Sequence, residues 1–177
     1  MDRSLAVRGL LYLGFGLGML GLLLGVQDID SRWGEAVVIL ICGLAIFHLN
    51  HQQSARRNGC VLLVFGGILI HLWVVKLACG VASRSDLGEH YDFLVMPIAL
   101  APMVHSVLLG QRAGVYSSVF VSLFGAFTIP SDDRWAFFAI SLFCGLTSVF
   151  ATKRVSKRGR LLRAGFWVGV MALLVDL

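Results

Sequence analysis

The sequence predicts an all-α protein: a polytopic integral membrane helix bundle of about seven transmembrane helices, with its N-terminus inside. Three observations predict this fold class. Hydrophobic residues make up 58% of the chain and charged residues only 14%, whereas ordinary globular domains carry about 25% charged residues. The apolar residues are gathered into seven continuous runs, and the charges between those runs alternate in sign. A hydrocarbon core ~30 Å thick needs ~20 helical residues to cross it, so each run indicates one transmembrane helix.

The seven predicted helices follow one another with short connections. In chain order they are Val7–Val26, Gly34–Leu49, Cys60–Gly80, Phe93–Leu109, Val115–Ile129, Trp135–Thr152 and Leu161–Leu177. The second and fifth are short for a full crossing, so they extend into their flanks or are accommodated by the local bilayer. The first helix and its outer loop, residues 1–33, are interpreted as an N-terminal anchor, because no A-x-A-like cleavage site follows the long apolar core. Residues 34–177 form the multi-helix membrane region.

Lys and Arg residues predict the orientation, because they collect in cytoplasmic loops. With the N-terminus inside, eleven of the 15 basic residues fall in inner segments, and only Arg32, Arg84 and Arg134 fall in outer loops. Acidic residues show the reverse distribution, since eight of the ten fall in outer loops. Seven crossings from an inner start place the C-terminus outside.

The densest basic run lies in the last inner connection. It contains Lys153, Arg154, Lys157, Arg158, Arg160 and Arg163. Each Lys or Arg near an anionic membrane surface contributes about 1 kcal/mol of attraction. We therefore interpret this run as a topological anchor that meets anionic lipid head groups, and we attribute the net charge of +5 to topology rather than to nucleic-acid binding.

Small residues follow one face of the first predicted helix, at Gly14, Gly18, Gly21 and Gly25. Two of these steps are G-x-x-x-G pairs, which allow membrane helices to approach closely. This face is predicted to pack against another helix of the bundle or against a second copy, so a homo-oligomer is left open. The alternative is that glycine is simply frequent in membrane helices.

Ionisable residues at membrane depth are functional candidates by default. His71, near the middle of the third predicted helix, is the first candidate for a proton-linked or ligand role, and His105 in the fourth helix is the second. Lys76 is assigned a structural role, because its long side chain reaches toward the membrane surface. Pro97 and Pro102 favour a kink in the fourth helix, which indicates a cavity wall or a pivot.

No catalytic, cofactor or metal residues are assigned. The chain has no G-x-x-x-x-G-K-[ST], H-E-x-x-H or G-x-S-x-G motif. His48, His51 and His105 share one predicted level, which leaves a metal site or a membrane enzyme as a minority alternative. No carboxylate or cysteine accompanies these histidines at ligand spacing.

From about residue 37 the chain resembles a known family. The segments that carry the resemblance are YDFLVMPIALAPMVHSVLLGQRAGVYSSVF (91–120) and SLFCGLTSVFATKRVSKRGRLLRAGFWVGV (141–170), with a weaker run at 56–80. A P-x-A-x-A-P-M helix, a G-x-R-A-G turn and an R-x-x-L-L-R-A-G entry to the next helix occur in the family's order. These features resemble the membrane region of the bacterial seven-transmembrane HD phosphohydrolases, a group that includes cyclic di-AMP phosphodiesterases.

The resemblance implies a plan that this chain meets only in part. Family members carry an anchor helix, an extracellular domain, a multi-helix membrane region and a cytoplasmic HD domain. That HD domain binds metals through His and Asp and hydrolyses a cyclic dinucleotide. Here only a short loop, 27–33, stands where the extracellular domain would be, and no HD domain follows before Leu177. We therefore expect a membrane region shortened before its last helix, to which none of the family's metal ligands or catalytic residues can be assigned.

Two hypotheses from different classes follow. The first is a transmembrane sensor or anchor module in the bacterial cytoplasmic (inner) membrane, which transmits a signal to a cytoplasmic HD-domain effector and is not itself an enzyme. The alternative is a small transporter or permease, with a cavity near His71 and the helix that contains Pro97 and Pro102.

Overall fold

The computed structural model describes residues 5–24, 32–50, 58–82, 98–129, 134–152 and 169–170. Within these ranges the long elements are helices: α1 (Leu5–Leu23), α2 (Trp33–Asn50), α4 (Asn58–Ala82), α5 (Leu100–Leu109), α6 (Gln111–Gly125) and α7 (Arg134–Ala151). Strands are absent from the described ranges. The all-α prediction is confirmed, whereas most of the predicted seventh helix, the basic run of 153–163, His51, Gly25 and Pro97 lie outside the described residues.

The helix bounds differ most from the prediction around Gly110. α5 begins at Leu100, after a turn at Ile98 and Ala99, and the predicted start at Phe93 lies outside the described residues. α6 spans Gln111–Gly125 instead of Val115–Ile129. Gly110 has a φ of 95°, a conformation that glycine adopts without steric cost, so α5 ends there and α6 begins one residue later. The predicted helix was placed to begin at the apolar residue Val115, but α6 begins four residues earlier, at the polar Gln111.

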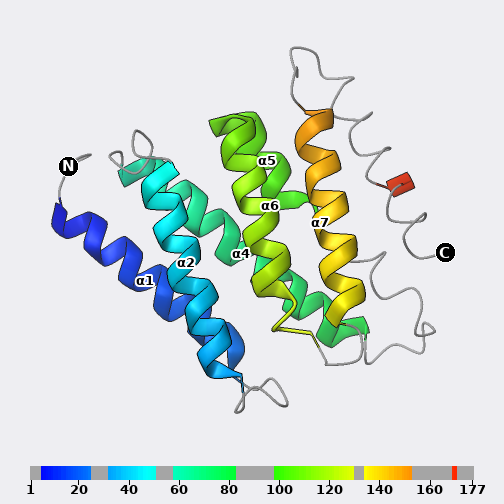
Figure 1. Cartoon of the computed structure of the whole chain (residues 1–177), viewed down its shortest axis with the longest axis horizontal. Coiled ribbons are helices and arrows are strands. Elements are labelled where there is room, and N and C mark those ends of the chain that lie inside the picture. The colour runs from blue at the N-terminus through cyan, green and yellow to red at the C-terminus, as the bar shows by residue number, and fades with distance from the viewer. Residues whose placement is uncertain are drawn as a thin grey trace.

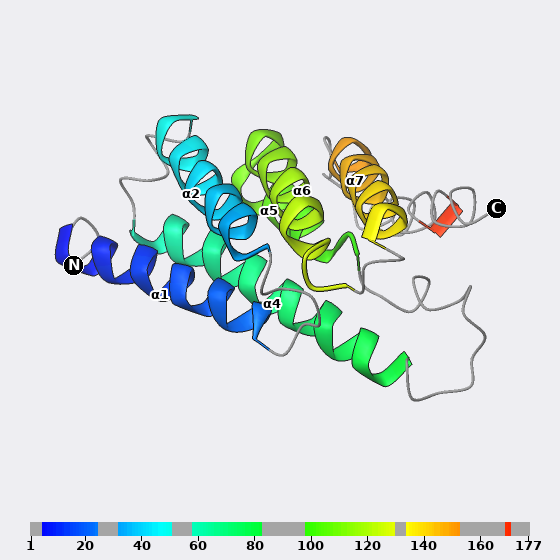
Figure 2. The same cartoon turned by 60° about the horizontal axis from the view of Figure 1, so that its bottom comes forward.

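The helices lie in two layers (Figures 1 and 2). Figure 2 shows α1 and α4 side by side beneath α2, α5, α6 and α7. α1 and α4 run in parallel, because Arg8 bonds Asn58 at one end of the pair and Lys76 bonds Leu22 near the other. The most extensive helix contacts are those of α6 with α5 and with α7.

Aromatic side chains fill the main core between the two layers. Phe15 of α1 stacks on Phe65 of α4, with ring centroids 4.3 Å apart. Phe47 of α2 lies against Phe65 at 4.9 Å and against Tyr116 of α6 at 5.4 Å. A second, smaller core joins the far end of α4 to α7 through Val75 and Phe137, among others.

The outward faces are apolar, and several polar side chains are buried inside the bundle among the apolar core residues. Leu10 is 74% exposed and Leu17 63% exposed, whereas Ser117 and Ser148 are fully buried. Water-soluble proteins rarely expose apolar surface on this scale. Three of the described helices, Leu5–Leu23, Asn58–Val81 and Arg134–Ala151, are long and apolar enough to cross a membrane. The structure is that of an integral membrane protein, and the number of crossings and the orientation stay predictions.

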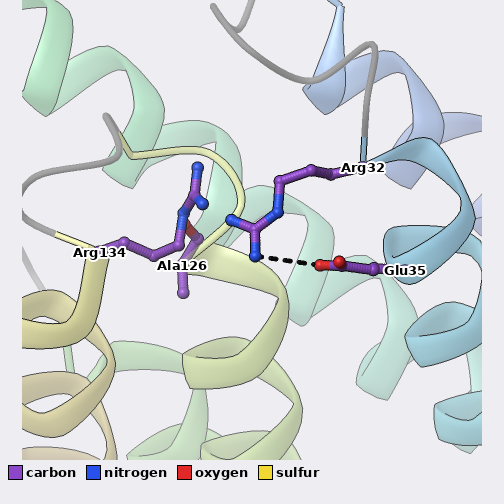
Figure 3. A network of polar contacts seen from close by, with 4 residues as sticks. All are labelled: Arg32, Glu35, Ala126 and Arg134. Carbon is purple, nitrogen blue, oxygen red and sulfur yellow. Dashed lines mark hydrogen bonds and ion pairs between the residues drawn. The ribbon is translucent and has the colours of Figure 1, made fainter.

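One end of the bundle is held together by two arginines (Figure 3). Arg32, just before α2, pairs with Glu35 at 3.1 Å. Arg134, which begins α7, donates from Nε to the carbonyl oxygen of Ala126 at 3.0 Å. Both guanidinium groups lie over the Phe127 ring, 5.6 and 5.9 Å from its centroid. The start of α2, the turn after α6 and the start of α7 therefore meet at the same end.

Candidate functional site

The structure brings His71 and His105 to one contact, between α4 and α5. Both side chains have 0% exposure. His105 Nε2 lies 3.2 Å from the carbonyl oxygen of Leu63, and the backbone N–H of Ala101 donates to His71 Nδ1 at 3.4 Å. Leu63 precedes His71 on α4, whereas Ala101 precedes His105 on α5. The two helices therefore cross in opposite directions, with one histidine on each.

His71 acts as an N-terminal cap for α5. The first amides of a helix have no acceptor within the helix. At the start of α5, Ala99 provides no side-chain cap. His71 supplies an acceptor for Ala101 from the neighbouring helix, and the next residue, Pro102, has no N–H to satisfy. Because α5 begins at Leu100, Pro102 lies in its first turn, where proline removes no intrahelical hydrogen bond.

A glycine makes room for His105. A Cβ atom at Gly67 would lie 2.5 Å from His105 Nε2 and 3.1 Å from its Cε1. Carbon atoms in proteins do not approach a ring nitrogen so closely, so any larger residue at 67 displaces the imidazole. Gly67 therefore allows His105 to reach the backbone of α4.

Each histidine keeps one ring nitrogen without a hydrogen-bond partner among the described residues. These atoms are His71 Nε2 and His105 Nδ1. Because His71 Nδ1 accepts a hydrogen bond, a neutral His71 carries its proton on Nε2, which is then an unused donor. A neutral His105 that donates to Leu63 leaves Nδ1 as an unused acceptor. Leaving a buried polar atom unsatisfied costs about 1–3 kcal/mol, so this contact is less stable than its packing alone would make it.

The residue after His105 connects this contact to the end of α7. Ser106 donates from Oγ to the carbonyl oxygen of Val149 at 3.4 Å, and Thr152 donates to Ser106 Oγ at 3.0 Å. Thr152 is the last described residue before the basic run at 153–163. On α5, adjacent residues therefore contact α4 on one side and the end of α7 on the other.

Small residues bring α5, α6 and α7 together. A Cβ atom at Gly114 would lie 2.8 Å from Ser106 Cβ and 2.8 Å from Val149 Cγ2, and a Cβ atom at Gly145 would overlap Ser118. Close approach of this kind is the usual basis of helix association in lipid. The small-residue pattern predicted this role for α1 and did not indicate Gly67, Gly114 or Gly145. A spacing search would not have found them, because they lie singly on three different helices, α4, α6 and α7.

The glycines predicted on α1 are placed unequally. A Cβ atom at Gly18 would lie 2.8 Å from Leu69 Cδ1 of α4, whereas one at Gly14 or Gly21 would meet nothing within 4 Å. Within the described part of the chain, this face therefore packs closely at Gly18. Packing of Gly14 and Gly21 against a second copy stays a prediction.

Lys76 has a structural role, as predicted, because it joins α4 to the end of α1. Its ammonium donates to the carbonyl oxygens of Leu22 at 2.6 Å and Leu24 at 2.9 Å, at the end of α1. Basic side chains commonly satisfy the last carbonyls of a helix in this way. The ammonium also lies 5.8 Å from the centre of the Trp73 ring.

Other predicted features lie apart from the α4–α5 contact. Across the described ranges, no three His, Cys, Asp or Glu side chains form a group that could hold a metal. His48 is exposed near the end of α2. A groove of about 630 Å³ opens between α2 and α6, and His71 does not line it.

The chain matches a known family over most of its length. Residues 32–177 match the family described as 7TM receptor with intracellular HD hydrolase. Among curated proteins the chain is similar to the cyclic-di-AMP phosphodiesterase PgpH of Listeria monocytogenes, with 23% identity over 161 residues. The match covers 89% of this chain and 22% of that relative, so the chain spans about a fifth of the relative's length. No solved structure matches. Because the family match extends over far more than half of the chain, the protein belongs to the family of seven-transmembrane receptors with an intracellular HD hydrolase.

Proposed function

We propose that this chain is the transmembrane sensor or anchor module of a seven-transmembrane HD-type phosphohydrolase in the bacterial cytoplasmic membrane. It passes a signal across the bilayer to a cytoplasmic HD domain that hydrolyses a cyclic dinucleotide, cyclic di-AMP by similarity to PgpH. The family match over residues 32–177 carries the proposal. The HD domain is carried either on the same polypeptide or on a separate protein, and this chain contributes no catalytic residue of its own.

The proposed coupling element is the contact of α5 with α4. The unused nitrogens of His71 and His105 leave this contact incompletely satisfied. A second arrangement that satisfies them would lie close in free energy to the described one, as a two-state element requires. Movement of α5 would displace the end of α7, because Ser106 is hydrogen-bonded to Val149 and Thr152. The basic segment 153–163, which follows directly, would transmit it at the inner surface.

Recovery of an HD-type hydrolase tests the proposal. The tagged chain is cross-linked in native membranes, purified and analysed by mass spectrometry. We expect an HD-type phosphohydrolase, either covalently continuous with the chain or cross-linked to it, and we expect loss of the chain to alter the cellular level of cyclic di-AMP. Failure to recover any HD-type protein, together with an unchanged nucleotide level, would contradict the proposal.

The role of the histidine contact is tested separately. In native membrane vesicles, His105→Gln is expected to change the rate of cyclic di-AMP hydrolysis severalfold, because it removes Nδ1 from the α4–α5 contact. His48→Gln is the matched control, because His48 is exposed on α2 and takes no part in this contact. Equal rates for the two variants at equal protein levels would remove the coupling role from His105.

A further inference from the structure

An open apolar groove lies between the middle of α2 and most of α6. Its volume is about 630 Å³, within the ~300–1,000 Å³ range of small-molecule sites. Its walls include Ile39 and Ile46 of α2 and Val119 and Leu123 of α6. Ile46 is 49% exposed, Val119 40% and Leu123 37%, so the groove opens toward the surface of the bundle.

At the floor of the groove, the polar groups of Tyr116 and Gly43 are hydrogen-bonded to each other. The two helices approach where Gly43 meets the Phe120 ring. There the Tyr116 hydroxyl donates to the carbonyl oxygen of Gly43 at 3.0 Å. Because this hydrogen bond is internal, an apolar occupant would leave neither group without a partner. The groove therefore suits a hydrocarbon chain.

One end of the groove is polar and positively charged. Gln111 and Arg112, in the first turn of α6, line that end, and Arg112 is exposed. Glu35 is the one acidic residue in the described part of the chain, and it lies at the opposite end of α2, paired with Arg32. Among the described residues Arg112 therefore has no carboxylate counterion. The N-terminus of α6 adds a partial positive charge at the same end.

We propose that this groove binds one anionic phospholipid, with an acyl chain between α2 and α6 and the phosphate at the Arg112 guanidinium. The occupant must be apolar along the groove and negatively charged at one end, which describes an anionic lipid and not an apolar transmembrane helix. The charge distribution predicts that Arg112 lies on the cytoplasmic side, where anionic lipids concentrate. The lipid site stands independently of the signalling role.

Lipid binding by the purified full chain tests the site. Native mass spectrometry in mild detergent would compare phosphatidylglycerol with phosphatidylcholine. We expect the wild-type chain to retain one phosphatidylglycerol in preference, and Arg112→Gln to weaken that binding about fivefold. Arg112→Lys is expected to retain most of it. Arg8→Gln is the matched control, because it removes the same charge at the same predicted side but outside the groove.

A second pair of variants tests the apolar part. Val119→Phe is expected to fill the groove and abolish lipid retention, whereas Val107→Phe on α5 is expected to leave it unchanged. The two valines are similarly exposed, at 40% and 44%, but only Val119 lines the groove. Equal retention of phosphatidylcholine by the wild-type chain would overturn the proposal. So would an equal effect of Arg8→Gln and Arg112→Gln, or a dimer that Val119→Phe dissociates.

Discussion

Gly67 determines whether His105 can reach α4. Alanine usually stabilises a helix by about 0.5–1 kcal/mol relative to glycine. At position 67 the added carbon would lie 2.5 Å from His105 Nε2, so the imidazole must leave its place beside Leu63. Overpacking of this kind costs about 1–3 kcal/mol, which exceeds the gain in helix propensity.

The adjacent glycine provides a matched control. We expect Gly67→Ala to lower the free energy of unfolding by about 1 kcal/mol, the difference between the middle values of these two effects. Gly66→Ala should leave it unchanged or raise it slightly, because a Cβ atom at Gly66 meets nothing within 4 Å. Reversible unfolding in mixed micelles measures both values. Equal stabilities for the two variants would show that His105 moves aside without cost.

At the scale of single helices, Lys76 holds the end of α1 against α4. Its ammonium bonds two carbonyl oxygens, those of Leu22 and Leu24. In lipid, unsatisfied carbonyls at a helix end are costly, because no water replaces the lost bonds. α1 begins and ends beside α4, so this cap contributes directly to its docking.

Removal of the cap should loosen α1 while α5, α6 and α7 stay packed. Lys76→Met keeps the length of the side chain but donates no hydrogen bond, and we expect a loss of about 1.5–3 kcal/mol, the range for bonds to a charged group. Hydrogen exchange of the last turn of α1 should accelerate correspondingly. Lys76→Arg retains donors and should remain close to wild type. Unchanged exchange in Lys76→Met would mean that the cap adds nothing to docking.

Much of the element order could be predicted, but the partners of each element could not. Apolar runs identify helices because lipid requires internally bonded backbone, and this signal is strong for α1, α4 and α7. His71 and His105 could be selected singly, since histidine is rare at membrane depth. Their joint position depends on how α4 crosses α5, which hydrophobicity does not determine. Gly67, Gly114 and Gly145 were missed for the same reason: each is required by close neighbours on another helix.

The whole molecule has two chemically distinct ends. Arg32 and Arg134 meet over Phe127 at one end, whereas Arg112 and His48 lie at the other ends of α6 and α2. α2 runs antiparallel to α6, because Gly43 lies against Tyr116 while Arg32 lies over Phe127. If both helices cross the bilayer, His48 and Trp135 must face opposite compartments.

Labelling of single cysteines in vesicles measures this directly. The four native cysteines, which form no disulfide, are first replaced: Cys42, Cys60, Cys79 and Cys144. His48→Cys and Trp135→Cys are then introduced at exposed positions near the two ends, the second replacing a side chain that is 79% exposed. We expect a membrane-impermeant maleimide to label His48→Cys only in inverted vesicles and Trp135→Cys only in right-side-out vesicles, because basic residues concentrate on the cytoplasmic side. Labelling of both positions from one side would show that the helices between them do not alternate across the bilayer, and the predicted sidedness of Arg112 would then be wrong as well.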